Sequence, residues 1–392
     1  MKKSSSLSVK DLHGIAQLAV HSTAAVTDLA EDLHQRIIAP RSATKGRTSG
    51  ITGMVYRSVR GVTRLVGVGV TGVIRLLGAQ EIIELGPAIG KARENLISIL
   101  NGVVGDHLHL SGNPLSIQMH LRSGDLTHAP AESEKYALFI HGLCLNENHW
   151  RTDAHVQTLI DLGYTPLFLH YNTGRNVADN GADLSALLEA RFGGNQVSLQ
   201  RNGKQVSPQR NGKQSELIVV AHSMGGLVIR SALHVAQSSH LWHTQVSKII
   251  FLGTPHLGAP LERSGNWIHA LWQATPYAGA LAPIAKIRSA GITDLRHGQI
   301  LAGDANSAAH VALPQKIKCY AIAATLAKTP GEFSDEVIGD GLVPISSALG
   351  LHADLARNLA LQKSKTKIIR GVGHMELLHA PQVSAQIRKW LA

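Results

Sequence analysis

The sequence predicts an α/β fold with a doubly wound, mostly parallel sheet, a helical lid insertion and an N-terminal helical extension. Two observations carry this prediction. From about residue 106 onward, brief apolar runs alternate with segments of helical periodicity, which is typical of parallel strands covered by helices on both faces. The residues before that point have helical periodicity instead. We therefore divide the chain into a helical extension, residues 1–105, and an α/β domain, residues 106–392.

The helical extension contains three apolar stretches. The first has helical spacing from Ile15 to Leu33, and the third runs from Ile89 to Val104. The second, residues 51–77, is interrupted by arginines and glycines, so it is too polar to span a bilayer. Two interpretations of this second stretch stay open: a helical hairpin packed on the main domain, which we favour, and an amphipathic segment lying on a membrane surface.

The α/β domain has a regular order of expected strands and helices. Helices fit between most of the strands, and two insertions interrupt the order. The tandem repeat at 196–213 is polar and glycine-rich, so we expect a solvated loop there. Residues 260–313 depart from the alternation, and we expect them to form the lid. The expected strands are 115–121, 136–140, 165–171, 217–221, 248–252, 318–323 and 367–371, and the expected helices are 154–161, 178–190, 224–236 and 381–391.

Composition and charge exclude several classes of function. The chain of 392 residues has a formal net charge of +11, which would suit an anionic partner, but its basic residues are scattered and no aromatic-interleaved basic stripe occurs. We therefore expect no nucleic-acid binding. The two cysteines, Cys144 and Cys319, offer at most one disulfide and no zinc-ligand spacing. The serine-rich start after Lys2 and Lys3 lacks the apolar core of a signal peptide, so we expect a cytoplasmic location, with peripheral contact to the inner membrane face as the alternative.

A candidate nucleophile lies at the end of the strand expected at 217–221. The pentapeptide Ala221-His222-Ser223-Met224-Gly225 joins this buried run to the following helix. A serine on such a sharp turn is presented at the strand end, where a distant histidine can reach it, and small residues must flank it two positions away on either side. Ala221 and Gly225 meet that requirement. The alternative is an ordinary strand–turn–helix, and the presence of partner residues decides between them.

The partners follow in the required order. His374 lies in a glycine-flanked loop directly after the last expected strand, where an imidazole can take the proton from Ser223. Asp340 lies between Gly339 and Gly341 after the preceding strand, and it would orient His374. An Asp-Gly pair is also a common turn signal, and the chain has 22 histidines. Three matches in order, each beyond an expected strand, favour a Ser-His-Asp triad.

Two backbone N–H groups are candidates for an oxyanion hole. Met224 follows the nucleophile at the start of its helix, where the helix dipole adds to the attraction for a negative oxygen. The second donor should come from the loop after an earlier strand, and Leu143 follows His141 and Gly142 after the strand at 136–140. We interpret His141 as a structural residue rather than a second base.

Together these motifs resemble the lipase and esterase branch of the α/β-hydrolase family. The segment Gly253–Pro260 is similar to a strand-end signature of bacterial triacylglycerol lipases and of the inositol deacylases of glycolipid anchors. The resemblance covers about residues 110–392 and implies ester hydrolysis through an acyl-enzyme. Some of these lipases bind calcium near the catalytic histidine, but the neighbourhood of Met375 and Glu376 lacks the ligand pattern, so we expect no metal and no cofactor. The matching segments are 141–143, 221–226, 253–260, 340–344 and 373–374.

The expected activity is hydrolysis of a carboxylic ester, with an acyl-ester or lipid substrate. Trp267, Leu271 and Trp272 in the lid insertion are candidate substrate contacts, and the alternative for them is a packed helical cap. Two further functions stay open: an acyltransferase that uses the same triad, and a membrane-associated scaffold with a vestigial site. The sequence carries no signal for an oligomeric state.

Overall fold

The computed structural model describes residues 5–7, 83–85, 87–123, 133–150, 154–193, 199–201, 204–206, 215–259, 289–303, 311–330 and 339–392. The chain forms two compact units, residues 1–93 with 107–116, and residues 94–106 with 117–392. In the first unit, β1 (Ser5–Leu7) pairs antiparallel with β2 (Ile83–Leu85). The predicted helix at 15–33 and the apolar stretch at 51–77 lie outside the described residues. Of the helices described, none combines the length and hydropathy needed to cross a membrane.

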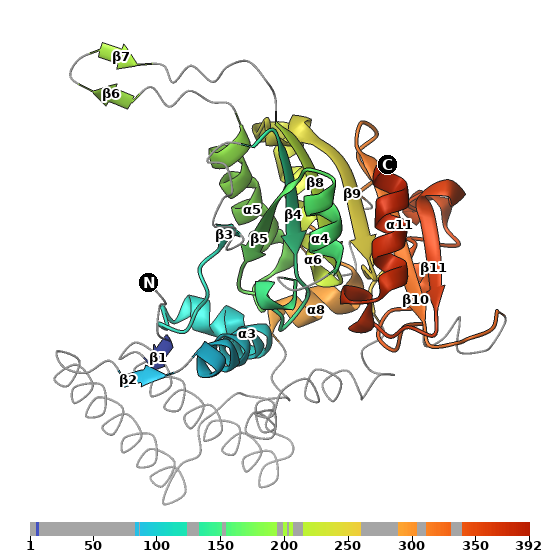
Figure 1. Ribbon diagram of the computed structural model, residues 1–392, viewed down its shortest axis with the longest axis horizontal. Coiled ribbons are helices and arrows are strands. Elements are labelled where there is room, and N and C mark those ends of the chain that lie inside the picture. The colour runs from blue at the N-terminus through green and yellow to red at the C-terminus, as the bar shows by residue number, and fades with distance from the viewer. Residues whose placement is uncertain are drawn as a thin grey trace, which may run out of the picture. The chain divides into compact units, whose positions relative to one another are not determined.

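The second unit is built on a seven-stranded sheet in the order β11-β10-β9-β8-β4-β5-β3 (Figure 1). Every neighbouring pair is parallel except β3 with β5. This confirms the predicted doubly wound, mostly parallel sheet. The strands are β3 (His120–Ser123), β4 (Lys135–Ile140), β5 (Thr165–His170), β8 (Glu216–His222), β9 (Val246–Leu252), β10 (Lys318–Thr325) and β11 (Thr366–Arg370).

The first predicted strand differs from the structure at its start. We expected a strand over 115–121, but β3 begins at His120. Asn113 explains the difference, because its side-chain oxygen accepts the Leu115 N–H and its carbonyl accepts the Ser116 N–H. An asparagine that bonds the backbone in this way makes a turn, so the extended conformation starts later.

The central strands are apolar because both of their faces are covered. In β8, every residue from Leu217 to Ala221 is fully buried. Side chains alternate between two hydrophobic clusters, since successive residues of a strand point to opposite faces. Leu138 and Val219 belong to one cluster, while Phe139 and Val220 belong to the other. These runs are typical of a parallel sheet with helices on both sides.

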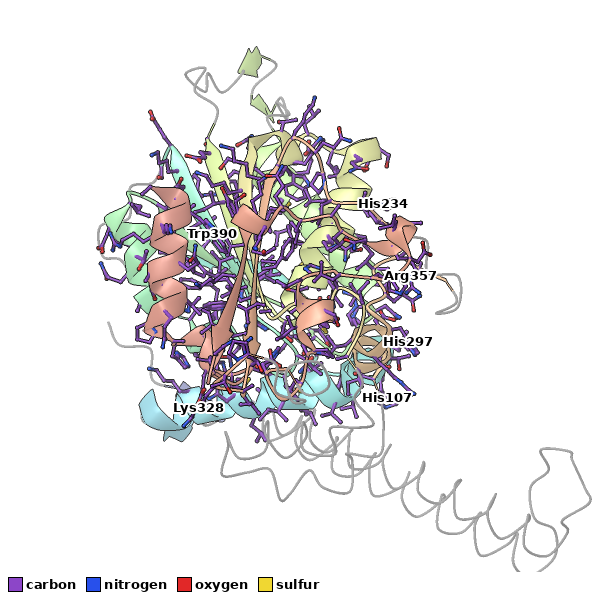
Figure 2. All side chains as sticks on the ribbon, turned by 90° about the vertical axis from the view of Figure 1, so that its right-hand side faces the viewer. His107, His234, His297, Lys328, Arg357 and Trp390 are labelled. Atoms are coloured by element: carbon purple, nitrogen blue, oxygen red, sulfur yellow. The ribbon has the colours of Figure 1, made fainter. Side chains whose placement is uncertain are left out.

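Helices cover the two faces as the sequence predicts (Figure 1). On one face, α5 (Val177–Phe192) packs on α6 (Met224–Ser239), and their apolar residues join the cluster that contains Val219. On the other face, α4 (Ala154–Asp161) and α11 (Pro381–Leu391) lie together in the second cluster. Trp390, labelled on α11 in Figure 2, stacks on Tyr320 of β10 with ring centroids 4.8 Å apart.

The two predicted insertions are described only in part. Within the tandem repeat, β6 (Leu199–Arg201) and β7 (Lys204–Val206) form a small antiparallel pair. Within the predicted lid, the structure describes α8 (Ala290–His297). The candidate substrate residues Trp267, Leu271 and Trp272 lie outside the described residues.

Candidate active site

Ser223 lies on a strained turn between β8 and α6. It is the N-cap of α6, and its backbone has φ 54° and ψ −126°, a conformation that residues other than glycine rarely adopt. Its N–H donates to the Leu252 carbonyl of β9 at 2.9 Å. Gly225 must be small, because a Cβ atom there would lie 2.7 Å from the Ile140 carbonyl oxygen. The packing of three elements therefore holds the serine in this conformation.

Asp340 and His374 form a buried pair. His374 Nδ1 lies 2.7 Å from Asp340 Oδ2, and the side chains are 5% and 0% exposed. The other carboxylate oxygen accepts the Leu342 N–H at 3.0 Å and the Val343 N–H at 2.8 Å. A carboxylate can only accept, so His374 donates from Nδ1, and Nε2 is the ring nitrogen left to act as a base.

Ser223 and His374 line the same pocket, which has a volume of about 430 Å³ including its opening to solvent. The structure therefore brings together the predicted nucleophile and the predicted base, and it hydrogen-bonds that base to the predicted acid. Among the described residues the Ser223 hydroxyl makes no hydrogen bond. In structures without substrate, the hydrogen bond between a nucleophile and its base is often long and tightens only when substrate binds. The rest of the lining is mostly apolar: Gly142, Leu143, Leu145, His222, Pro255, Ala259, Leu295, Leu342, Val343 and Met375.

The loop after β4, residues 141–146, runs directly beside the nucleophile. We call this segment the β4 loop. A Cβ atom on Gly142 would lie 2.9 Å from Ser223 Cβ, so only glycine allows this close approach. Leu143, the predicted oxyanion donor, is the next residue and lines the pocket. Met224, the other predicted donor, is the first residue of α6. The N–H of a first helical residue has no partner within its helix and lies at the positive end of the dipole.

Gly253, directly after β9, is a second close approach in the site. Its φ of +56° favours glycine, and a Cβ atom there would lie 3.2 Å from both Asp340 Oδ2 and His374 Cε1. Further along the same segment, His256 is buried with its ring edge against Phe251, and burial lowers the pKa of His256 well below its ordinary value of 6.5. This segment therefore packs against the Asp340–His374 pair, and burial keeps His256 neutral.

His222 is a site residue that the sequence did not indicate. Its Nε2 lies 3.1 Å from the backbone carbonyl of His374, and the two ring centroids are 4.7 Å apart. Burial lowers the pKa of His222 well below 6.5. A carbonyl accepts, so neutral His222 donates from Nε2 and supports the loop that carries the base. Its position directly before Ser223 was the one sequence feature that could have indicated a role at the site, but with 22 histidines in the chain it did not single His222 out.

His141 has the surroundings expected of a structural residue. Its ring stacks on Tyr171 with centroids 4.5 Å apart, and the Tyr171 hydroxyl donates to the His141 carbonyl at 2.7 Å. Burial lowers the pKa of His141 to about 3, so the ring is neutral at physiological pH. Within the described ranges, no three His, Cys, Asp or Glu side chains come together as a set of metal ligands.

The order of the sheet, with Ser223 on the turn after β8, defines the fold class, which is that of the α/β-hydrolases. More particularly, residues 134–327 match the family model described as the PGAP1-like alpha/beta domain. The matched segment runs from β4 to the end of β10, so it includes Leu143 and Ser223 and stops before Asp340. No curated protein matches the chain.

Solved structures similar to this chain include three esterases and lipases. A Bacillus licheniformis lipase in mature form is 21% identical with a TM-score of 0.43, covering 70% of this chain and 98% of that one. The naproxen esterase of Bacillus subtilis is 12% identical with a TM-score of 0.40, covering 70% and 88%. A soluble variant of Saccharomyces cerevisiae monoglyceride lipase is 12% identical with a TM-score of 0.40, covering 70% and 91%. At such low scores, the strand order and the family match carry the assignment.

Proposed function

We propose that this protein is a serine hydrolase that cleaves carboxylic esters with Ser223 as nucleophile, His374 as general base and Asp340 as the residue that orients the base. The observation that carries the proposal is the 2.7 Å hydrogen bond between His374 Nδ1 and Asp340 Oδ2, made at a pocket that Ser223 also lines. With Nδ1 protonated, Nε2 of His374 is free to accept the hydroxyl proton.

The reaction would proceed by acyl transfer through the serine. His374 Nε2 takes the proton of Ser223 as Oγ attacks the ester carbonyl, and the same proton is then given to the departing alcohol. A water molecule, deprotonated by His374 in its turn, releases the acyl group and restores Ser223. The N–H groups of Leu143 and Met224 are the proposed donors to the oxyanion, where the loss of one donor typically costs about 10²–10³ in rate.

The pocket supports an acyl or lipid ester as substrate. Its lining is apolar on several sides, with Leu145, Leu295 and Met375 among the contributing side chains. Apolar walls favour a hydrocarbon group by removing it from water, at about 25 cal/mol per Å². The reaction needs polar groups only around the ester group, namely the nucleophile, the base and the oxyanion donors, which matches a pocket with few other polar side chains.

The test is hydrolysis of p-nitrophenyl esters of graded chain length by the full chain. We expect Ser223→Ala to abolish hydrolysis and labelling by a fluorophosphonate, while Ser238→Ala, an exposed serine on the same helix, retains both. Hydrolysis by the Ser223→Ala protein in a clean preparation would overturn the assignment. Product analysis with a long-chain alcohol present separates hydrolysis from transfer to that alcohol, and an unlabelled parent protein would indicate a scaffold.

A further inference from the structure

Part of the N-terminal helix belongs to the same compact unit as the sheet. Helix α3 spans Pro87–Leu110, and its segment Glu94–Asp106 is grouped with residues 117–392. We call residues 94–106 the docked segment. Inside it, Val104 has non-helical angles, φ −132° and ψ 21°, so α3 is kinked. The kink lies between Gly102 and Gly105, and glycines are a common cause of kinks.

Hydrogen bonds tie the docked segment to three parts of the α/β domain. Asn172 Nδ2 donates to the Gly105 carbonyl at 2.8 Å, and the Ser289 hydroxyl donates to the Gly102 carbonyl at 2.7 Å. The third tie reaches the β4 loop. Asn146 Nδ2 lies 2.9 Å from Asn95 Oδ1 and 3.1 Å from Ser98 Oγ.

Cys144, the residue after the proposed oxyanion donor Leu143, is held in a strained conformation. Its φ is 61°, which is unfavourable for a residue with a side chain. Its N–H donates to Thr173 Oγ1 at 3.1 Å, and its thiol, 3.8 Å from the Ile99 carbonyl, points at the docked segment. Such strain persists only where the surroundings impose it. Burial raises the pKa of the Cys144 thiol to about 12, so this sulfur stays protonated and serves as a packing group.

The docked segment provides the surface that Cys144 rests on. A Cβ atom on Gly102 would lie 2.2 Å from Cys144 Sγ and 3.0 Å from the Cys144 backbone nitrogen and Cα. A Cβ atom on Gly105 would lie 1.9 Å from Asn172 Oδ1. Asn172 Oδ1 in turn accepts the Gly174 N–H, so it orders the loop that carries Thr173. The two glycines therefore let the helix backbone lie directly against Cys144 and against Asn172, which orders the loop whose Thr173 side chain accepts the Cys144 N–H.

We propose that the docked segment positions the oxyanion donor Leu143, with Gly102 as the positioning residue that seats Cys144. This inference rests on the proposed hydrolase function. Leu143 lies between Gly142, which abuts Ser223, and Cys144, which abuts Gly102. A shift of Cys144 would therefore move the backbone of Leu143, and its N–H with it. A displacement at Gly102 would move a donor that acts mainly in the transition state, which lowers kcat more than it raises KM.

The test is a double-mutant cycle with Gly102→Ala and Cys144→Ala. Alanine has the higher helix propensity, so a purely local view predicts that Gly102→Ala stabilises the protein. We expect instead a ten- to hundredfold loss of kcat on a p-nitrophenyl ester with KM within about twofold of the parent. Removing the sulfur should relieve the clash, so the double variant should regain at least tenfold over Gly102→Ala. Lys91→Ala, an exposed position on α3, is the matched control and should keep the parent rate.

The cycle has outcomes that overturn the inference. The positioning role is wrong if Gly102→Ala keeps the kcat of the parent. It is also wrong if the double variant is no faster than Gly102→Ala. If Gly102→Ala does not fold, Asn95→Ala replaces it. This variant removes one of the two docked-segment partners of Asn146 without adding volume, and we expect a three- to tenfold loss of kcat at unchanged KM.

The inference and the proposed function can fail separately. A parent protein that neither hydrolyses esters nor reacts with a fluorophosphonate disproves the function. The contact between positions 102 and 144 can be tested without an activity assay, by comparing the melting temperatures of the four proteins in the cycle. Strictly additive shifts in melting temperature would show that positions 102 and 144 are not coupled, and would overturn the positioning role.

Discussion

Nε2 of His222 lies 3.1 Å from the backbone carbonyl of His374, so the residue before the proposed nucleophile supports the loop of the proposed base. Both side chains are buried, and their rings are in contact. The end of β8 and the loop after β11, 152 positions apart in the sequence at these two residues, are thereby fixed to one another at the site.

His222→Phe should lower kcat about tenfold with little change in KM. Phenylalanine keeps an aromatic ring in this space but has no donor, and a lost buried hydrogen bond of about 1 to 2 kcal/mol corresponds to roughly a tenfold change in rate if it is felt in the transition state. His222→Gln restores an N–H donor and should recover part of the rate. Steady-state kinetics on one ester compare the three proteins. Equal losses in the Phe and Gln variants would contradict the role of the hydrogen bond.

Asp340→Asn should lower kcat by about 10³–10⁴ and leave the fold intact. Its remaining oxygen can still accept the N–H groups of Leu342 and Val343, while its NH₂ group cannot accept from His374 Nδ1. The imidazole would then favour the tautomer that cannot take the serine proton. Kinetics and a melting curve check this prediction. A variant within tenfold of the parent would show that Asp340 does not orient the base.

Stability should fall steeply in mild acid because three buried histidines must stay neutral in the folded protein. The pKa of His141 is lowered to about 3, and those of His222 and His256 lie well below 6.5. Below pH 6.5 the unfolded chain binds protons at these positions and the folded chain does not, so the free energy of unfolding decreases as pH falls. From pH 7 to 5.5 the loss is about 1 kcal/mol for each histidine, or roughly 3 to 4 kcal/mol together.

Urea denaturation at pH 7 and pH 5.5 measures this loss. His256→Gln removes one of the three titrating groups, so this variant should lose about 1 kcal/mol less than the parent over the same interval. The comparison uses the pH dependence and not the absolute stability, which the substitution also changes. Identical pH dependence in the two proteins would contradict the assignment of a depressed pKa to His256.

Deleting one copy of the tandem repeat, residues 205–213, should leave kcat and KM unchanged. The repeat lies between the end of α5 and the start of β8, whereas Ser223 follows the opposite end of β8. Shortening a loop changes its closure entropy by only about 0.6 kcal/mol for each halving. Kinetics and a melting temperature within a few degrees of the parent are the expected result. A large loss of activity would assign the repeat a role at the site.

The sequence was sufficient for the parts of the fold that depend on local patterns. β8 and α6 were predicted because an uninterrupted apolar run meets a helix at a turn flanked by Ala221 and Gly225. Asp340 and His374 were predicted as partners because each follows a strand and lies beside glycines, and the structure joins them by a hydrogen bond. Their roles with Ser223 stay predictions until the variants are assayed.

Contacts through space could not be predicted in the same way. The sequence around Gly102 does not indicate that it faces Cys144, because a glycine within a helical pattern indicates only a lower helix propensity. The same holds for His222 and His374, which meet only after the sheet has formed. The start of β3 was displaced by the turn at Asn113, a side-chain-to-backbone interaction that apolar alternation does not reveal.

The duplicated nine-residue unit at 196–213 also has an evolutionary meaning. An in-frame duplication survives where lengthening the chain harms neither folding nor activity, so its two near-identical copies mark a position that tolerates change. Because this position lies at the amino end of β8, a reporter or affinity peptide inserted there would leave the chemistry at the carboxyl end undisturbed. The repeat thus identifies a natural point of attachment for a label on this protein.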